Sequence, residues 1–319
     1  MANGEWEKRV VLCPTMLALE FLAQLADAHR EALAARVREF SIDGEVFRFN
    51  SEPAIMGVVN LSADSWYRES VCLTVEKAVG RGKVLQAQGA RLIDAGAEST
   101  LGHAARRNRE EQKRMLLPVI RGLAAEKILV SVETYDHVVA RACLEAGARV
   151  INLTGTEKAG EVFRMAAGHS AAVIICYVQG RHARAVGDFV FSADPVAAMS
   201  DYFSRLAELA AKNGLEKIMI DPGLGFYYPN LRDGAARVRR QMSVFLNTFR
   251  LRALGFPVCH ALPHAFEYFG EEVRGAEPFF AVLAALGKTD LFRTHEVPRI
   301  KAVLDALKVF PAIHEIHTL

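Results

Sequence analysis

The feature that most constrains the fold is a repeated alternation between short apolar runs and longer amphipathic stretches beyond Pro53. Each apolar run is short enough, and apolar enough, for a parallel strand buried on both faces. The runs lie at Ile55–Val59, Arg91–Ala95, Ile128–Glu133, Arg149–Leu153, Ala172–Val178, Lys217–Asp221, Pro257–Ala261 and Asp290–Thr294. Amphipathic helical patterns lie between them, for example at Val71–Gln88, Arg109–Leu123, Asp136–Ala146 and Pro195–Asn213.

Glycines stand where these helices should stop, just before the next strand, at Gly89, Gly147, Gly214 and Gly255. About eight strand–helix units over roughly 265 residues have the size and rhythm of a (β/α)₈ barrel. An open, doubly wound sheet is the alternative, but no phosphate-binding glycine fingerprint follows the first strand. The sequence therefore predicts an α/β fold, a (β/α)₈ TIM barrel at residues 51–319.

Residues 1–50 follow a different pattern. We expect a strand at Val10–Leu12, a helix from a Thr15 cap to about Phe40, and a hairpin at Ile42–Phe49 that turns at Asp43-Gly44. This segment shows no chemistry of its own, and we interpret it as a helical and hairpin addition packed on one end of the barrel.

Composition argues against several classes of partner. A net charge of +2 gives no case for a nucleic acid or an acidic membrane surface, and no apolar run reaches membrane-spanning length. The five cysteines are scattered without metal-ligand spacing, which favours reduced thiols in the cytoplasm. The polar, acid-containing N-terminus argues against a signal peptide.

Polar residues occupy the C-terminal ends of nearly all the predicted strands, the end at which barrels build their functional sites. They include Asn60, Asp94, Glu133, Asn152, Gln179, Asp221, Arg293 and His295, with Ser99 and His264 in the following loops. Any one of them has an ordinary explanation as a loop residue. Together they predict a polar pocket with several hydrogen-bonding walls.

Several segments in order resemble the dihydropteroate synthase family from about Ile55 to the C-terminus. They are GVVNLSADSW, LIDAGAEST, SVETY, AGARVINLTG, VQG, IDPGLGF and RTHEV. The resemblance implies condensation of p-aminobenzoate with 6-hydroxymethyl-7,8-dihydropterin pyrophosphate in folate synthesis, with Mg²⁺ assisting the release of pyrophosphate. It also implies a homodimer whose partners are a small pterin pyrophosphate and an aromatic amine.

The anion end of such a site would use Asn60, Arg293 and His295. Arg293 and His295 are two residues apart on one strand and point to the same side, and a guanidinium with an imidazole suits a diphosphate. Asn60 would offer its amide to the metal or to the phosphate. The alternative for Arg293 is a surface ion pair with Glu296.

The pterin end would use Asp221, whose carboxylate accepts two hydrogen bonds from ring N–H and amine groups. Asn152, Glu133 and His264 would contact other edges of the ring, and Asp221 could instead simply cap a turn. Thr100, Ser99 and Trp66 would lie over the aminobenzoate, although Trp66 is equally well explained as a core anchor.

The chain departs from the family in ways that keep three functions open. Leu262-Pro263-His264 stands where the family has Ser-Arg-Lys, Glu133 replaces an aspartate, and Leu101 replaces a basic residue. The alternatives are an active synthase, a related barrel transferase with another acceptor, and a noncatalytic pterin-binding protein. A corrinoid-linked methyltransferase is less favoured, because it would not need Arg293 and His295.

Overall fold

The computed structural model describes residues 16–65, 67–99 and 104–310, so the strand predicted at Val10–Leu12 and the cap at Thr15 lie outside it. At its centre is an eight-stranded parallel sheet, and each strand overlaps one of the predicted runs. The strands are β3 (Ala54–Asn60), β4 (Leu92–Gly96), β5 (Val130–Thr134), β6 (Val150–Leu153), β7 (Ala172–Cys176), β10 (Ile218–Asp221), β11 (Cys259–Ala261) and β12 (Leu291–Thr294).

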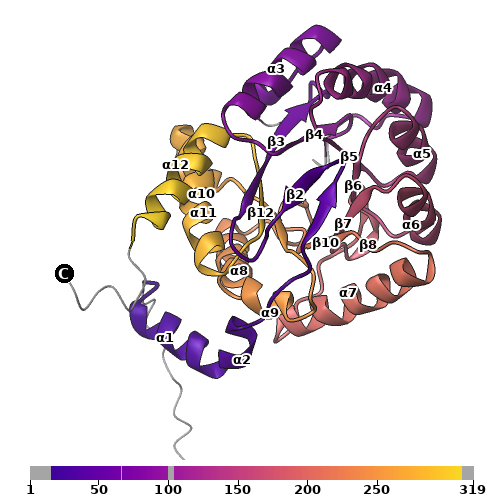
Figure 1. Ribbon diagram of the computed structural model, residues 1–319. Helices are drawn as coiled ribbons and strands as arrows, with labels where there is room; N and C mark the ends of the chain where they lie inside the picture. Colours follow the sequence, from indigo (N-terminus) through magenta and orange to yellow (C-terminus); the bar gives the residue numbers. More distant parts are fainter. Residues whose placement is uncertain (1–15, 66, 100–103, 311–319) are drawn as a thin grey trace, which may run out of the picture.

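The sheet closes on itself. Its strand order is β10-β7-β6-β5-β4-β3-β12-β11. A parallel bridge pairs Ile220 with Val258, and the Ile220 N–H donates to the Pro257 carbonyl at 3.0 Å, which joins the two end strands. The predicted (β/α)₈ barrel is therefore confirmed, and the open sheet is excluded (Figure 1).

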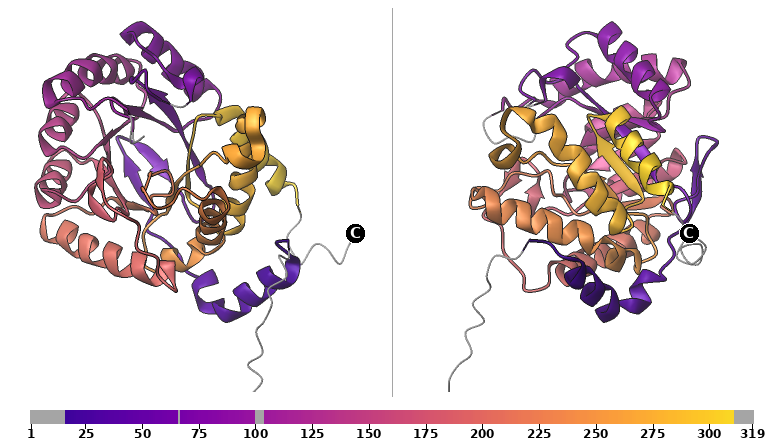
Figure 2. Two further views of the ribbon diagram at one scale, coloured as in Figure 1. Left: turned by 180° about the vertical axis from the view of Figure 1, so that it is seen from behind. Right: turned by 90° about the vertical axis from the view of Figure 1, so that its left-hand side faces the viewer.

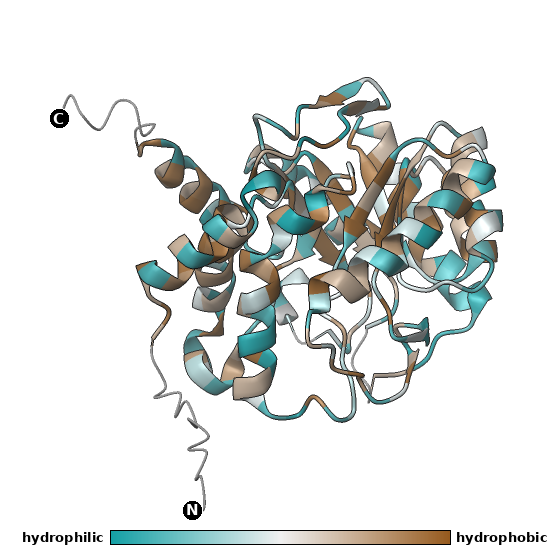
Figure 3. Cartoon of the chain, turned by 90° about the horizontal axis from the view of Figure 1, so that it is seen from below, coloured by the Kyte–Doolittle hydropathy of each residue, from teal (hydrophilic) through white to brown (hydrophobic). Residues whose placement is uncertain are grey.

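A ring of helices, in which hydrophilic and hydrophobic residues are mixed, surrounds strands that are mostly hydrophobic (Figure 3). The helices are α3 (Val75–Ala87), α4 (Arg109–Ala125), α5 (His137–Glu145), α6 (Ala159–Gly168), α7 (Pro195–Lys212), α8 (Gly234–Leu246), α9 (Thr248–Arg252), α10 (Phe266–Phe269), α11 (Ala276–Leu286) and α12 (Val297–Lys308). Shorter elements are the β8 (Gly180–His182) and β9 (Ala185–Val186) hairpin and the 3₁₀ turns Arg68–Ser70 and Gly270–Gly275. Among the described residues, no helix is both long and apolar enough to span a membrane.

The four predicted helix-stop glycines all have positive φ, between 77° and 116°. A residue with a Cβ rarely adopts this conformation, so glycine allows each chain reversal from helix to strand.

Period-two alternation along the strands explains why one end of the barrel is apolar and the other polar. Leu92 and Asp94 face the same side of β4, and Met219 and Asp221 face the same side of β10. The first of each pair belongs to an apolar cluster near the strand starts, and the second lies at the C-terminal end. On these two strands the polar side chain therefore lies at the C-terminal end.

The N-terminal helix is shorter than predicted. Helix α1 (Leu19–Ala28) breaks at His29, α2 (Arg30–Leu33) follows, and no helix continues to Phe40. The reason is competition for the backbone: the Asn50 side chain pairs with the Val37 N–H and carbonyl at 2.9 and 2.8 Å. These bonds take the place of the ones a continuing helix would make.

The predicted hairpin is present as β1 (Phe40–Ile42) and β2 (Glu45–Phe47), and it lies over the N-terminal end of the barrel (Figures 1 and 2). Ile42, Phe47 and Phe49 are buried against the apolar cluster at the strand starts. Arg91, just before β4, donates to Glu45 at 2.8 Å. The hairpin therefore covers this end, and ligands must enter from the opposite one.

Candidate functional site

A cavity of about 370 Å³ opens at the C-terminal ends of the strands. Every described residue with a predicted role toward the diphosphate, the pterin or the amine lines it, whereas Asp94 and Gln179, also expected at this polar pocket, do not. The predicted residues that line it are Asn60, Ser99, Glu133, Asn152, Asp221, His264, Arg293 and His295. Trp66 and Thr100 lie outside the described residues, so their predicted contacts with an aromatic acceptor stay predictions.

The floor of the cavity is a chain of hydrogen bonds between four strands. Arg293 donates from Nε to Asp94 at 2.7 Å and from Nη2 to Glu133. Asp94 also accepts from the Ser131 hydroxyl at 2.6 Å and from the Asn152 amide at 3.1 Å.

In this network the partners of Arg293 are Asp94 and Glu133, which were not predicted. Its guanidinium is already held by two carboxylates, and it makes no surface pair with Glu296. Burial alone would lower the pKa of Arg293, but Asp94 and Glu133 outweigh burial and raise it. Burial raises the pKa of Glu133, against the opposing effect of Arg293. Any anion must therefore compete with these carboxylates for the guanidinium.

Asp221 has the predicted turn-capping contact and also lines the cavity. One carboxylate oxygen accepts from the Gly223 N–H at 2.7 Å, which caps the turn, and the side chain also lines the cavity. Gly223 has a φ of 68°, and a Cβ there would lie 2.3 Å from the Tyr177 carbonyl, so only glycine fits this turn. Burial raises the pKa of Asp221 to about 6.

His264 lies at the rim of the cavity with its ring centroid 3.9 Å from that of Phe266. Burial lowers the pKa of His264 to about 4, so the imidazole is neutral at pH 7. Arg237, a cation in the cavity lining that acts on His264, makes two hydrogen bonds to Glu267. The β11 side of the cavity thus presents a neutral ring beside an arginine that is already paired.

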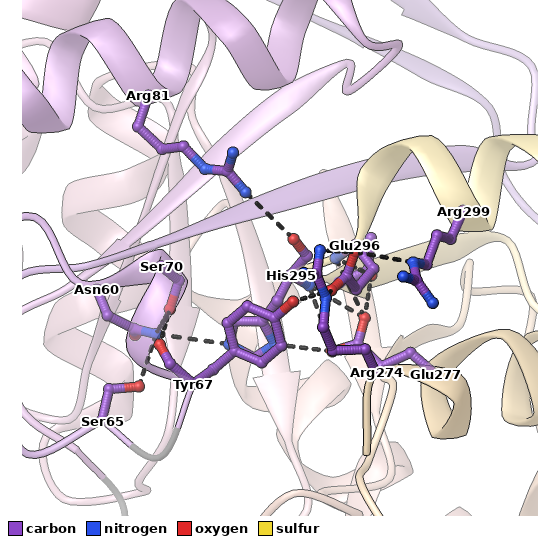
Figure 4. Close-up of polar contacts among 11 residues, drawn as sticks. Asn60, Ser65, Tyr67, Ser70, Arg81, Arg274, Glu277, His295, Glu296 and Arg299 are labelled. Carbon is purple, nitrogen blue, oxygen red and sulfur yellow. Dashed lines mark hydrogen bonds and ion pairs between the residues drawn. The ribbon is translucent and has the colours of Figure 1, made fainter. Parts of the chain in front are cut away.

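The neighbouring strands β12 and β3 bring His295 and Asn60 to the cavity (Figure 4). The Asn60 amide donates to the hydroxyls of Ser65 and Ser70 at 2.9 and 2.6 Å, and its nitrogen lies 3.5 Å from His295 Nε2. The ring of Tyr67 stacks on His295 at 4.6 Å with an interplanar angle of 16°. These contacts fix the imidazole and the amide against each other.

A family model described as "Pterin binding enzyme" matches residues 56–259. The chain belongs to this family. A dihydropteroate synthase from Synechocystis sp. is 27% identical over 277 residues, which cover 82% of this chain and 92% of the relative.

Solved structures support the same family assignment. A Xanthomonas albilineans dihydropteroate synthase with 4-aminobenzoic acid superposes with a TM-score of 0.70 at 28% identity, and the match covers 86% of this chain and 99% of that one. A structure of the same enzyme with 7,8-dihydropteroate gives a TM-score of 0.69 at 27% identity over 86% of this chain and all of the other (100%). The resemblance seen in the motifs is confirmed: the chain is a pterin-binding TIM barrel of the dihydropteroate synthase family.

In this family member, sequence reasoning assigned no role to several residues that shape the site. Asp94 was visible as a charge inside the apolar run Arg91–Ala95, and that position alone signals a buried polar contact. Glu98 lines the cavity and accepts from the Tyr135 hydroxyl at 2.7 Å. Glu277 reaches His295 from α11, and no motif pointed to it.

Proposed function

We propose that this protein condenses p-aminobenzoate with 6-hydroxymethyl-7,8-dihydropterin pyrophosphate and releases pyrophosphate. The observation that best supports this function is a single cavity that holds both kinds of group the reaction needs. Asp221, Glu133 and the Asn152 amide line it together with Asn60, Arg293 and His295. Relatives named dihydropteroate synthase, including one solved with 7,8-dihydropteroate, support the same reaction.

The carboxylates suit a pterin because that ring presents several N–H and NH₂ donors along one edge. The Asp221 carboxylate accepts two of them, and Glu133 accepts another. Asn152 already donates to Asp94, and its Oδ1 accepts weakly from the Cys176 thiol at 3.2 Å. A stronger N–H donor on the ring can replace that thiol at the amide oxygen.

In the reaction, the bond between the pterin methylene carbon and the pyrophosphate oxygen breaks, and its electron pair leaves with pyrophosphate. The aryl amine nitrogen forms the new C–N bond and loses one proton to water. The residues of this chain hold and orient the leaving group through His295 and Arg293, because charge develops there in the transition state. Ser99, at the cavity wall, contacts the amine substrate.

The residues around the leaving group also fit a magnesium ion that arrives with the diphosphate. Among the described residues, no hydrogen bond to the Asn60 amide oxygen is formed, and no cluster of three or more His, Cys, Asp or Glu could enclose a metal. Mg²⁺ is commonly held by one or two protein oxygens plus substrate phosphates, so Asn60 would hold it. When bound, the ion neutralises charge on the leaving pyrophosphate.

The second candidate is a noncatalytic pterin-binding protein. The observation that favours it is the neutral His264, which occupies the place of the family lysine and supplies no cation to the ring. The carboxylate floor would still bind the pterin. A transferase with another aromatic acceptor is a variant of the first candidate and uses the same pyrophosphate end.

The deciding experiment measures pyrophosphate release from the pterin substrate with p-aminobenzoate, for the wild type and for Asp221→Asn as the site control. Release that depends on p-aminobenzoate and is lost in the variant supports the synthase. Tight pterin binding without release supports the noncatalytic protein, and release only with other amines supports another acceptor. Rescue of a bacterium that lacks its own dihydropteroate synthase gives an independent test.

A further inference from the structure

Glu277 is a buried carboxylate in an apolar helix. It occupies the first turn of α11, in the segment AEPFFAVLAAL, and its side chain is 1% exposed. Among the described residues, its ion-pair partner within 4 Å is His295, and no lysine or arginine pairs with it. A buried Glu is costly unless its oxygens accept hydrogen bonds, so its partners need an explanation.

Four donors converge on this carboxylate (Figure 4). His295 Nδ1 lies 2.8 Å from Oε1, while the N–H groups of His295 and Glu296 donate to Oε2 at 3.1 and 3.3 Å. The hydroxyl of Thr294 donates to the same oxygen. An ionised carboxylate only accepts hydrogen bonds, so this set of donors matches it, whereas an acid proton would oppose one of them.

We infer that Glu277 is a positioning residue that fixes the tautomer and the direction of His295. Because Oε1 accepts from Nδ1, the neutral ring carries its proton on Nδ1 and turns Nε2 toward Asn60 and the cavity. When the ring is an imidazolium, both nitrogens donate, Nδ1–H to Glu277 and Nε2–H to an oxygen of the diphosphate. In both forms Nε2 is the nitrogen offered to the ligand. The inference rests on the proposed pyrophosphate site.

A second contact holds the His295 ring, and it is made to the face of the ring. Tyr67 stacks on His295, and the Tyr67 hydroxyl donates to Glu296, which Arg274 also binds, with Nη2 at 3.1 Å. Stacking on Tyr67 can stop the His295 ring from tilting. It does not stop the ring from flipping about its Cβ–Cγ bond, because a flipped ring lies in the same plane. The hydrogen bond at Nδ1 distinguishes the two nitrogens at short range, and Glu277 makes that bond.

Glu277 could instead serve only to fasten the connection between β12 and α12, since it binds two backbone N–H groups there. Thr294→Val separates these roles. It removes a hydroxyl from the same carboxylate, in the same buried place, but leaves the Nδ1 bond. A purely structural role would make Thr294→Val and Glu277→Gln behave alike.

The first test is a ¹⁵N NMR measurement of the His295 tautomer in the full-length protein at pH 8, assigned with His295→Gln. In the wild type we expect the proton on Nδ1. In Glu277→Gln the amide oxygen stays with the two backbone N–H groups and the NH₂ faces Nδ1, so the proton should move to Nε2. Glu277→Asp withdraws the carboxylate by one methylene and should give a mixture. A wild-type ring with its proton on Nε2 would overturn the inference.

The second test is calorimetry with inorganic pyrophosphate, with and without Mg²⁺. Glu277→Gln should weaken binding about tenfold to a hundredfold, the usual effect of removing a group that orients a histidine. Thr294→Val should stay within about threefold of wild type. If Glu277 acts through His295, the double variant should bind no more weakly than His295→Gln alone.

These outcomes separate the inference from the proposed function. Additive losses in the double variant, or equal losses in Thr294→Val, would contradict a positioning role. A wild-type protein that has the Nδ1–H tautomer but binds no pyrophosphate would contradict the proposed function and leave the assignment of Glu277 intact.

Discussion

Arg293 on β12 donates from Nε to the carboxylate of Asp94 on β4, at 2.7 Å, across the strand β3 that lies between them. A terminal nitrogen of the same guanidinium, Nη2, donates to Glu133 on β5. The arginine expected to receive the diphosphate is therefore also the countercharge for two carboxylates, of which Asp94 is fully buried. Arg293 therefore contributes both to the stability of the fold and to the predicted binding of the diphosphate.

Replacing Arg293 by Met should lower both the stability of the protein and its affinity for pyrophosphate. Asp94 and Glu133 would remain without their cation, and breaking a buried pair by removing one partner costs about 3–5 kcal/mol. Pyrophosphate affinity should also fall, because a charge-assisted contact is lost. Urea denaturation and calorimetry with pyrophosphate and Mg²⁺ measure the two effects.

The matched control for this prediction is Arg293→Lys, which keeps the charge but cannot reach both carboxylates with a planar fork. Its loss of stability should be smaller than that of Arg293→Met. If Arg293→Met unfolds at the same urea concentration as the wild type, the buried ion pairs contribute nothing to stability.

The fold and the membership of the site could be predicted from the sequence, but not the partners within the site. Apolar runs such as Ile55–Val59 identify strands locally, and the C-terminal ends of parallel strands must converge. That Arg293 reaches Asp94 across a strand depends on side-chain length and direction in three dimensions. The same holds for Glu277, because an acid in the first turn of a helix has an ordinary explanation in the helix dipole.

The early end of the N-terminal helix was unpredictable for a related reason. Its local pattern favours a helix to about Phe40, yet the hydrogen bonds that decide the outcome come from Asn50 and from the Gly255 carbonyl, which accepts from the Arg38 N–H at 2.9 Å. Such distant partners are not visible in a local pattern.

Arg252 ties this N-terminal segment to the barrel and provides the second prediction. Its guanidinium lies 3.2 Å from Asp290 and from the Asn50 side-chain oxygen, and both charged side chains are buried. Arg252→Met would leave the buried Asp290 carboxylate with the Val258 N–H as its remaining donor within the described part of the chain, which should cost about 3–5 kcal/mol in urea denaturation.

Arg250→Met is the control for this pair, because Arg250 lies on the same helix and pairs with Asp194, which is 44% exposed. Exposed pairs contribute about 0–1 kcal/mol, so this variant should be close to wild type. Equal losses in the two variants would argue against the Arg252–Asp290 pair as the anchor of the segment.

The third prediction concerns pH. Burial raises the pKa of Asp221 to about 6 from its ordinary value of 3.8, so the folded protein holds this proton more tightly than the unfolded chain. The contribution of Asp221 to the unfolding free energy is therefore most favourable below about pH 4 and decreases as the pH rises to about 6.

Pterin affinity should depend on the same proton of Asp221, but it should decrease as the pH falls. The ring donors need an ionised carboxylate, so pterin affinity should fall about tenfold per pH unit below about pH 6. Asp221→Asn should bind the pterin tenfold to a hundredfold more weakly at pH 7, because an amide donor then faces ring donors at a cost of about 1–3 kcal/mol. Its affinity should also lose this pH dependence. Fluorescence titration with a dihydropterin from pH 5 to 8 measures both, and a flat wild-type profile would remove Asp221 from the pterin site.

The last prediction concerns His264, which is neutral at pH 7 because burial lowers its pKa to about 4. His264→Lys should supply an ammonium donor to the pterin edge and increase both pterin affinity and the rate of pyrophosphate release. The nearby Arg237 is neutralised by Glu267, so a second cation can be accommodated there. His264→Gln is the control, since it offers a neutral donor without charge and should change the rate little. A Lys variant that binds the pterin more tightly yet releases no pyrophosphate would favour the noncatalytic protein, and one that binds it more weakly would exclude His264 from the pterin edge.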